Sequence, residues 1–239
     1  MANSPSEKLA VLIDAENAQA VIAAELLAEI SRYGMATIKR AYGDWTTQNL
    51  RGWKEALQNL AIQPVQQFSY TTGKNATDSA LIIDAMDLLH SKAVQGFCIV
   101  SSDSDFTRLA TRIREAGLSV FGFGERKTPQ PFVAACDKFT YTEILRPSDN
   151  PTAAASEAPA PLKPMLCAAI AAAARDSGWA TLAVVGSLLN KNSPSFDPRN
   201  YGCQKLGELV RKQPYVEVRE TPVGDGLTNV HLYVRLKEH

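Results

Sequence analysis

Acidic side chains follow two apolar runs in the first half of this 239-residue chain. The run 9–13 leads directly into Asp14, and the run 97–100 leads through two serines into Asp103 and Asp105. Apolar runs of this length are typical of buried parallel strands. Ligands of open α/β sheets bind just beyond the carboxyl ends of such strands. We therefore expect these aspartates to lie close together, where a cation or a proton must relieve their repulsion.

A third element is expected to contribute an acid to this cluster. Asp78 falls in the first turn of a helix predicted over 76–90, after a strand predicted over 62–69. The helix dipole alone favours an acid in that position. Beside two strands that end in acids, a shared site is the better interpretation. Lys74, just before the helix, could meet a phosphate.

Carboxylates alone favour a hard divalent cation, Mg²⁺ or Mn²⁺, over zinc. The expected ligands are Asp14, Asp78, Asp103 and Asp105. Asn17, one helical turn beyond the first of them, could orient substrate or water. Such a cluster suits metal-assisted attack of water on a phosphodiester. The sequence has no glycine-rich phosphate loop, so nucleoside triphosphate binding is not indicated.

Four other polar residues bear on this site. Asp84 shares a helical face with apolar residues, and a buried carboxylate must be paired, protonated or functional. It is rotated about 240° from Asp78 at ~100° per residue, so it is not expected to bind the same ion, and a supporting role stays open. Asp44 is expected to be an ordinary solvated acid. Ser101 and Ser102 are expected to hold the acidic loop by hydrogen bonds.

Strand and helix patterns alternate in the part of the chain that precedes residue 147. This alternation predicts an α/β fold with a doubly wound parallel sheet and helices on both faces. The predicted strands cover 9–13, 35–43, 62–69, 97–101, 118–123 and a short segment near 138–144, and the predicted helices cover 18–32, 47–60, 76–90 and 105–116.

A Pro- and Ala-rich segment, 147–161, predicts a linker between a first domain, 8–146, and a second domain, 162–239. The second domain has three helical patterns followed by two strictly alternating segments, which predicts a small α+β winged helix. Its helices are predicted over 162–175, 181–190 and 203–213, and its hairpin turn at Gly224-Asp225-Gly226.

Composition excludes few classes of function. The chain carries 25 basic and 25 acidic residues, so bulk charge does not mark a nucleic-acid binder. Its four cysteines are widely spaced, which indicates isolated thiols in a reducing compartment rather than a zinc site. The sequence shows no membrane-spanning stretch and no signal-peptide core. We expect a cytoplasmic protein without a membrane partner, and a homodimer is compatible with the sequence.

The motifs of the first domain resemble those of the NYN family, PIN-like nuclease domains that include the LabA-like proteins. They are Asp14-x-x-Asn17, Lys74-x-x-x-Asp78 and Ser101-Ser102-Asp103-Ser104-Asp105-Phe106, and the resemblance covers roughly residues 8–146. It implies a PIN-like Rossmannoid α/β/α sandwich and a metal-dependent ribonuclease. By the same resemblance, Asp14, Asp78 and Asp103 bind metal, Asp105 joins them, and Asn17 belongs to the site.

The second domain resembles a LOTUS (OST-HTH) domain, a winged helix associated with RNA binding. The supporting residues are Gly178-Trp179, the segment 197–202, Leu206, Leu209 and the predicted hairpin. Trp179 and Tyr201 could stack on bases, although such aromatics are more often core residues. The candidate RNA-binding cations are Lys74, Arg199, Lys205, Arg211 and Lys212, but Glu208 shares the helical surface of the last three, and a mixed face is usually only solvated.

Three functions are consistent with these observations. The first is a metal-dependent endoribonuclease whose second domain binds or presents RNA. The second is a catalytically silent RNA-binding or regulatory scaffold, although the set of acids is complete. The third is another phosphotransfer enzyme with an acid-ended sheet, Toprim-like or haloacid-dehalogenase-like, which explains neither Asn17 and Asp78 nor the winged helix.

Overall fold

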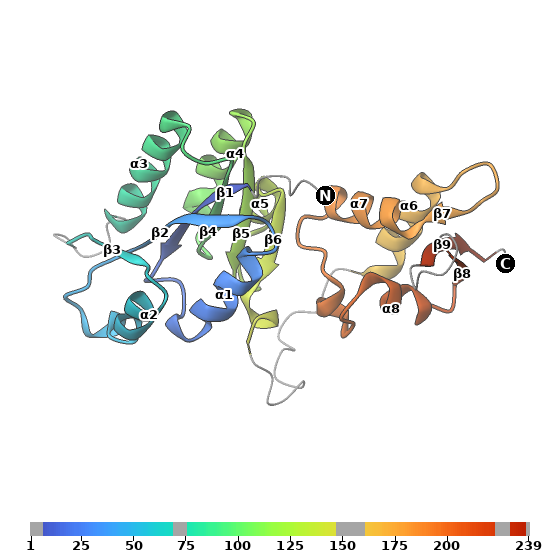
Figure 1. The fold of residues 1–239 in the computed structure, drawn as a ribbon, viewed down its shortest axis with the longest axis horizontal. Helices are drawn as coiled ribbons and strands as arrows, with labels where there is room; N and C mark the ends of the chain where they lie inside the picture. The colour runs from blue at the N-terminus through green and yellow to red at the C-terminus, as the bar shows by residue number, and fades with distance from the viewer. Residues whose placement is uncertain (1–6, 69–75, 147–160, 223–229, 238–239) are drawn as a thin grey trace. The chain divides into compact units, whose positions relative to one another are not determined.

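A computed structural model of the protein describes residues 7–68, 76–146, 161–222 and 230–237. The chain divides into two compact units, Met1–Ala154 and Ala155–His239, which are coloured in chain order in Figure 1. Three of the features predicted from sequence fall outside the described residues: Lys74, the hairpin turn 224–226 and the linker up to residue 160.

The first unit contains a sheet of six parallel strands, as the alternating sequence pattern predicts. The strand order is β3-β2-β1-β4-β5-β6. The chain therefore builds outward in one direction from β1 to β3, and then returns to the centre to start the other half at β4. The strands are β1 (Lys8–Asp14), β2 (Met35–Gly43), β3 (Gln63–Gln66), β4 (Gly96–Val100), β5 (Ser119–Gly124) and β6 (Lys138–Tyr141).

Helices cover both faces of this sheet and make an α/β/α sandwich (Figure 1). One face packs against α1 (Ala23–Ile30) and α2 (Trp53–Asn59), and the other against α3 (Ala76–Ser91), α4 (Thr107–Glu115) and α5 (Gln130–Ala135). Because both faces are covered, β1 and β4 are apolar at consecutive positions. The sequence pattern did not predict α5, because six residues are too few to show a helical period.

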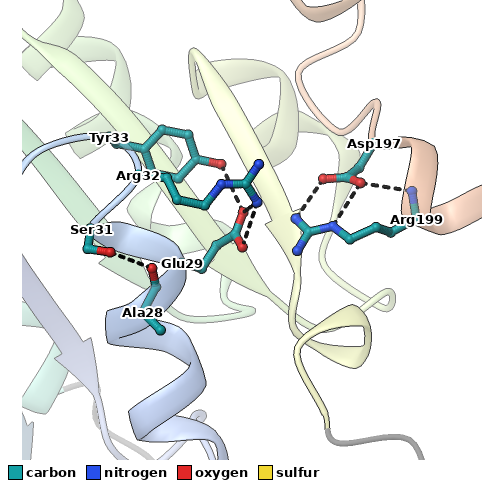
Figure 2. A network of polar contacts seen from close by, with 7 residues as sticks. All are labelled: Ala28, Glu29, Ser31, Arg32, Tyr33, Asp197 and Arg199. Carbon is teal, nitrogen blue, oxygen red and sulfur yellow. Dashed lines mark hydrogen bonds and ion pairs between the residues drawn. The ribbon is translucent and has the colours of Figure 1, made fainter. Parts of the chain in front are cut away.

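Glu29 is a buried carboxylate near the end of α1, remote in sequence from the acidic motifs. Its two oxygens accept hydrogen bonds from Arg32 Nη1 at 2.9 and 3.0 Å, and Oε1 accepts one from the Tyr33 hydroxyl at 3.4 Å (Figure 2). The Tyr33 ring in turn stacks on Phe121 of β5, with ring centroids 4.5 Å apart. Arg32 thus compensates the charge of Glu29, and the stacking of Tyr33 on Phe121 joins the end of α1 to the sheet.

Asp84 fastens α3 across the opposite face of the sheet. Its carboxylate accepts hydrogen bonds from the guanidinium of Arg40 and the hydroxyl of Tyr42, both on β2. Burial and this carboxylate raise the pKa of the Tyr42 hydroxyl, which therefore stays a donor. The structure thereby settles the open role of Asp84, which is paired with β2. Its contacts hold the helix whose first turn carries Asp78.

Replacing Asp84 with alanine should lower the free energy of unfolding of the first unit by about 1–3 kcal/mol, because Tyr42 and Arg40 would lose their shared acceptor. Urea unfolding measures the change. The matched control is Asp87→Ala, an exposed acid on the same helix, which should change stability by less than about 0.5 kcal/mol. Equal losses in the two variants would contradict an anchoring role for Asp84.

The second unit has the winged-helix arrangement expected from its sequence. Three helices, α6 (Leu162–Ala173), α7 (Leu182–Asn192) and α8 (Leu206–Arg211), pack with a three-stranded antiparallel sheet in the order β7-β9-β8. The strands are β7 (Ala180–Thr181), β8 (Val216–Pro222) and β9 (Val230–Leu236). The two-residue β7 was not predicted, because only its pairing with β9 defines it.

The four cysteines are free thiols, and three of them, Cys98, Cys136 and Cys203, are buried. Burial raises the pKa of Cys98 strongly and that of Cys136 to about 12, so neither is a nucleophile near neutral pH. This agrees with the interpretation of isolated core thiols. None of the helices in the described segments has the length and apolarity to cross a bilayer.

Candidate metal centre

The acidic residues of the first unit meet where the strand order reverses, between β1 and β4. The two strands pair in parallel with Ile13 opposite Val100, so the next residues, Asp14 and Ser101, lie side by side at the carboxyl ends. A sheet of this topology opens a crevice at this point, because the connections leave toward opposite faces. The strand-end prediction therefore holds in three dimensions.

Asp14 is buried and its carboxylate accepts four hydrogen bonds. Oδ1 accepts from the backbone N–H groups of Glu16 and Asn17 at 3.2 and 3.3 Å. Oδ2 accepts from the Asn17 side-chain amide at 2.7 Å and from the Ser101 hydroxyl at 2.8 Å. Burial raises the pKa of Asp14, and these hydrogen bonds partly offset that rise. The protein thus holds this carboxylate in one orientation.

Ser101 connects Asp14 to the acidic loop that follows β4. Its hydroxyl donates to Asp14 and accepts a hydrogen bond from the backbone N–H of Asp103 at 3.1 Å. Asp103 in turn caps the next turn, because its Oδ1 accepts from the backbone N–H of Asp105 at 2.9 Å. Ser102 Oγ accepts from the backbone N–H of Glu125 at 2.9 Å. The prediction that both serines hold this loop is confirmed.

Three carboxylates, from Asp78, Asp103 and Asp105, form the closest group of acids. One oxygen from each lies within 4.8 Å of the others. Burial and the negative charges of Asp14, Asp103, Asp105 and Glu16 raise the pKa of Asp78 to about 6. Acids from α3, the end of β1 and the loop after β4 therefore share one electrostatic site. Within the described segments, no lysine or arginine forms an ion pair with Asp78 or Asp103.

The donor set of this group fits a hard divalent cation. Its ligand atoms are carboxylate oxygens, which Mg²⁺ and Mn²⁺ prefer, and its repulsion is of the kind that such an ion relieves. Asp14 is outside this group of three, but its charge has the largest effect among those that raise the pKa of Asp78. All four predicted ligands therefore belong to one acidic site, and the metal-binding role of Asp14 stays a prediction.

Two further acids at this edge were missed or misjudged from the sequence. The charge of Glu16 adds to the rise in the pKa of Asp78, and its only sequence signal is its place two residues after Asp14. Asp44, predicted to be solvated, is buried, so that prediction is wrong. Asp44 Oδ1 accepts from the Thr46 hydroxyl at 2.6 Å and from Gln66 Nε2 at 2.9 Å. It directly follows β2, and the strand-end argument applied to β2 would have found it.

The predicted RNA-binding cations of the second unit are mostly paired with acids of the same unit. Arg199 donates from Nε and Nη2 to Asp197 at 3.0 and 2.8 Å (Figure 2). Arg211 pairs with Glu220, and Lys212 pairs with Glu208 at 2.8 Å. Lys205 is exposed at the start of α8. These residues do not gather into a patch of uncompensated positive charge, and their contact with RNA stays a prediction.

Replacing Asp78 with asparagine should raise the melting temperature of the first unit at pH 8 in EDTA by a few degrees. The pKa of Asp78 lies at about 6 in the folded protein against an ordinary 3.8. Ionised Asp78 therefore opposes folding, and this penalty builds up as pH rises from 4 to beyond 6. The gain should shrink toward pH 4. Thermal melts at the two pH values, with Asp87→Asn as control, test this, and equal gains at both would contradict it.

Three of the solved structures with partial similarity to the chain are the following. A protein of unknown function from Vibrio parahaemolyticus RIMD 2210633 is 20% identical, with 58% of this chain and 94% of that chain covered and a TM-score of 0.49. An uncharacterized protein from Nitrosomonas europaea is 36% identical, with 39% and 90% covered and a TM-score of 0.30. A protein from Chromobacterium violaceum is 45% identical, with 35% and 91% covered and a TM-score of 0.27. No curated protein matches.

Two domain families match the chain in the order expected from its motifs. The NYN domain matches residues 8–145 and the OST-HTH/LOTUS domain matches residues 156–228. NYN domains are PIN-like nuclease domains, and OST-HTH/LOTUS domains are associated with RNA binding. The first match covers more than half of the chain and includes every acid of the cluster. The protein therefore belongs to the NYN domain family and carries an OST-HTH/LOTUS domain after its nuclease-type domain.

Proposed function

We propose that this protein is a metal-dependent endoribonuclease that hydrolyses RNA phosphodiester bonds at the acidic cluster of its NYN domain. The observation that carries the proposal is the convergence of Asp78, Asp103 and Asp105, with carboxylate oxygens within 4.8 Å of one another, at the point where the sheet reverses its order. Such convergence is costly without a cation, so its presence at a ligand-binding edge favours a site built for one.

Asp78, Asp103 and Asp105 are the residues proposed to hold Mg²⁺ or Mn²⁺. When bound, such an ion activates water and neutralises charge on the transferring phosphate and the leaving oxygen. Asp105 is exposed and the other two are half-buried, so a phosphodiester can approach the group from solvent. The turn capped by Asp103 holds Asp103 and Asp105 at a fixed separation.

Asp14 and Asn17 are proposed to hold the acidic loop in place rather than to contact the substrate. Asp14 is buried and occupied by hydrogen bonds, two of which come from Asn17. Its fixed negative charge adds to the attraction of the site for a cation. Through Ser101 it also sets the place of the loop that carries Asp103. The sequence-based expectation that Asn17 orients water or substrate stays a prediction beside this positioning role.

Cleavage of single-stranded RNA by the full chain should require Mg²⁺ or Mn²⁺ and stop in EDTA. Asp78→Asn and Asp103→Asn should each lower the rate at least about 100-fold, because each removes a charge that holds the ion. Asp87→Asn, the same change at an exposed site on α3, should cleave like the unaltered protein. A covalently closed RNA circle is the substrate of choice, because only an endonuclease can open it.

The outcomes of this assay separate the candidate functions. RNA retained by the protein without cleavage, across several metals and substrates, would favour a catalytically silent scaffold. Cleavage unaffected by either aspartate change would place the chemistry elsewhere and overturn the proposed site. Circular dichroism of each variant distinguishes a lost site from a lost fold.

Ser101→Ala tests the positioning role of the buried serine. The rate should fall roughly 10–100-fold, as for the loss of a group that orients metal ligands. The hydrogen bond from Ser101 lowers the pKa of Asp14, so its removal should also shift the acid limb of the pH–rate profile to higher pH. The control is Ser102→Ala. Among the hydrogen bonds described, the Ser102 hydroxyl only accepts from the backbone N–H of Glu125 and does not contact Asp14. An unshifted acid limb would argue against this role.

A further inference from the structure

The three-stranded sheet of the second unit has two unlike faces. One face carries the buried side chains of Ala180, Val216 and Val234 and closes the core of the unit. The antiparallel register places Thr181, Tyr233 and Arg219 in one row across the other face. Arg235 and Glu217 form the neighbouring row. The outward face therefore carries an aromatic side chain and two arginines. Small polar side chains would be sufficient there if the face were only exposed to solvent.

Trp179 lies on this outward side, next to the edge strand β7. It directly precedes β7, and two guanidinium groups lie over its ring: that of Arg235 at 4.8 Å and that of Arg219 at 5.9 Å from the ring centre. The indole is only partly buried. A Cβ on Gly178 would come within 3.4 Å of Arg235 Cδ, so a glycine with φ of +75° lets the chain bring the indole close to β9.

The two arginines differ in how far their charge is compensated. Arg235 donates from Nη2 and Nε to Glu217 at 2.7 and 3.2 Å. Arg219 is exposed, and among the described residues no carboxylate pairs with it. His231, also exposed, continues the same face along β9. Glu217 is the one acid on the outward positions of the described parts of β8 and β9. Because it faces two arginines, Arg219 and Arg235, the face carries a net positive charge.

We propose that the surface formed by Trp179, Arg219, Tyr233 and Arg235, here called the wing face, binds single-stranded RNA. The partly buried indole, with guanidinium groups over its ring, can contact an unpaired base, and Arg219 can neutralise an adjoining phosphate. This pairing of an aromatic surface with cations complements single-stranded RNA, whereas paired bases would not reach the indole. The inference rests on the RNA-directed function proposed above. It locates RNA contact on the sheet rather than on α8.

The wing face contrasts with α8, where the sequence placed the candidate cations. Arg211 on α8 and Lys212, which follows it, are paired with neighbouring acids, while Lys205 before the helix is exposed. Arg219 lies over the Trp179 ring, and no ion pair of Arg219 is described. Redirecting Arg219 to a phosphate breaks no ion pair described in the structure. Contact of a phosphate with Arg211 or Lys212 would instead compete with their ion pairs.

The test measures binding of a fluorescein-labelled single-stranded RNA 20-mer of mixed sequence to the full chain in EDTA, which prevents metal-dependent cleavage. Trp179→Leu should weaken binding roughly tenfold through the loss of base stacking. Arg219→Gln should weaken it and reduce the dependence of log Kd on log salt by about one ion. Lys191→Gln, which removes an exposed cation from α7, should leave the affinity unchanged. Trp179→Phe, which keeps an aromatic ring, should restore most of the affinity lost in Trp179→Leu.

A second measurement reports on stacking itself. Titration with RNA should quench part of the tryptophan fluorescence of the unaltered protein, and this quenching should be lost in Trp179→Phe although that variant still binds. Arg219→Gln changes only an exposed side chain, so it keeps the test valid if Trp179→Leu proves unfolded by circular dichroism.

Three outcomes would contradict RNA binding by the wing face. They can be distinguished from a failure of the proposed nuclease function. Unchanged RNA affinity in both Trp179→Leu and Arg219→Gln would assign the face to another partner, such as a protein. Equal competition by duplex RNA of the same sequence would exclude base stacking. RNA affinity absent from the unaltered protein would remove the inference together with the RNA function. Loss of cleavage in the aspartate variants, by contrast, is independent of all three.

Discussion

The parallel pairing of β1 with β4 is the constraint on which the candidate site depends. These strands are neighbours only because the chain returns to the centre of the sheet after building its first half. Their register places Asp14 beside Ser101, and one serine hydroxyl then links the acid of the first strand to the loop of the other. A slip of one residue would turn these side chains toward opposite faces and dissolve the cluster.

Electrostatic cost is the second feature that joins structure to function. Three acids away from the cluster are compensated locally: Glu29 by Arg32, Asp84 by Arg40 and Asp44 by hydrogen bonds. At Asp78, by contrast, burial and the charges of four neighbouring acids raise the pKa to about 6. Repulsion among acids at one edge of the sheet is the pattern expected of a cation site.

The two units differ in the charge of their proposed functional surfaces. The NYN unit concentrates negative charge at one sheet edge, which suits a metal ion but repels a polyanionic substrate by itself. The wing face proposed for the second unit carries arginines and a partly buried indole, side chains that suit contact with an RNA strand. Separating the two chemistries in two units avoids neutralising the acids with the cations that bind RNA.

The sequence by itself determined the parallel sheet, the winged helix and the convergence of Asp78, Asp103 and Asp105, because long apolar runs and strict alternation are local signals. It missed α5 and β7, which are too short to show a period, and it misjudged Asp44, whose burial depends on Gln66 and Thr46. Only the tertiary structure showed that Asp84 accepts hydrogen bonds from β2 and that Asp14 accepts one from Ser101. It also showed that Asp14 is outside the closest group of three acids and that an arginine lies over the Trp179 ring. Those outcomes depend on strand order and register, which bring together residues that no local pattern relates.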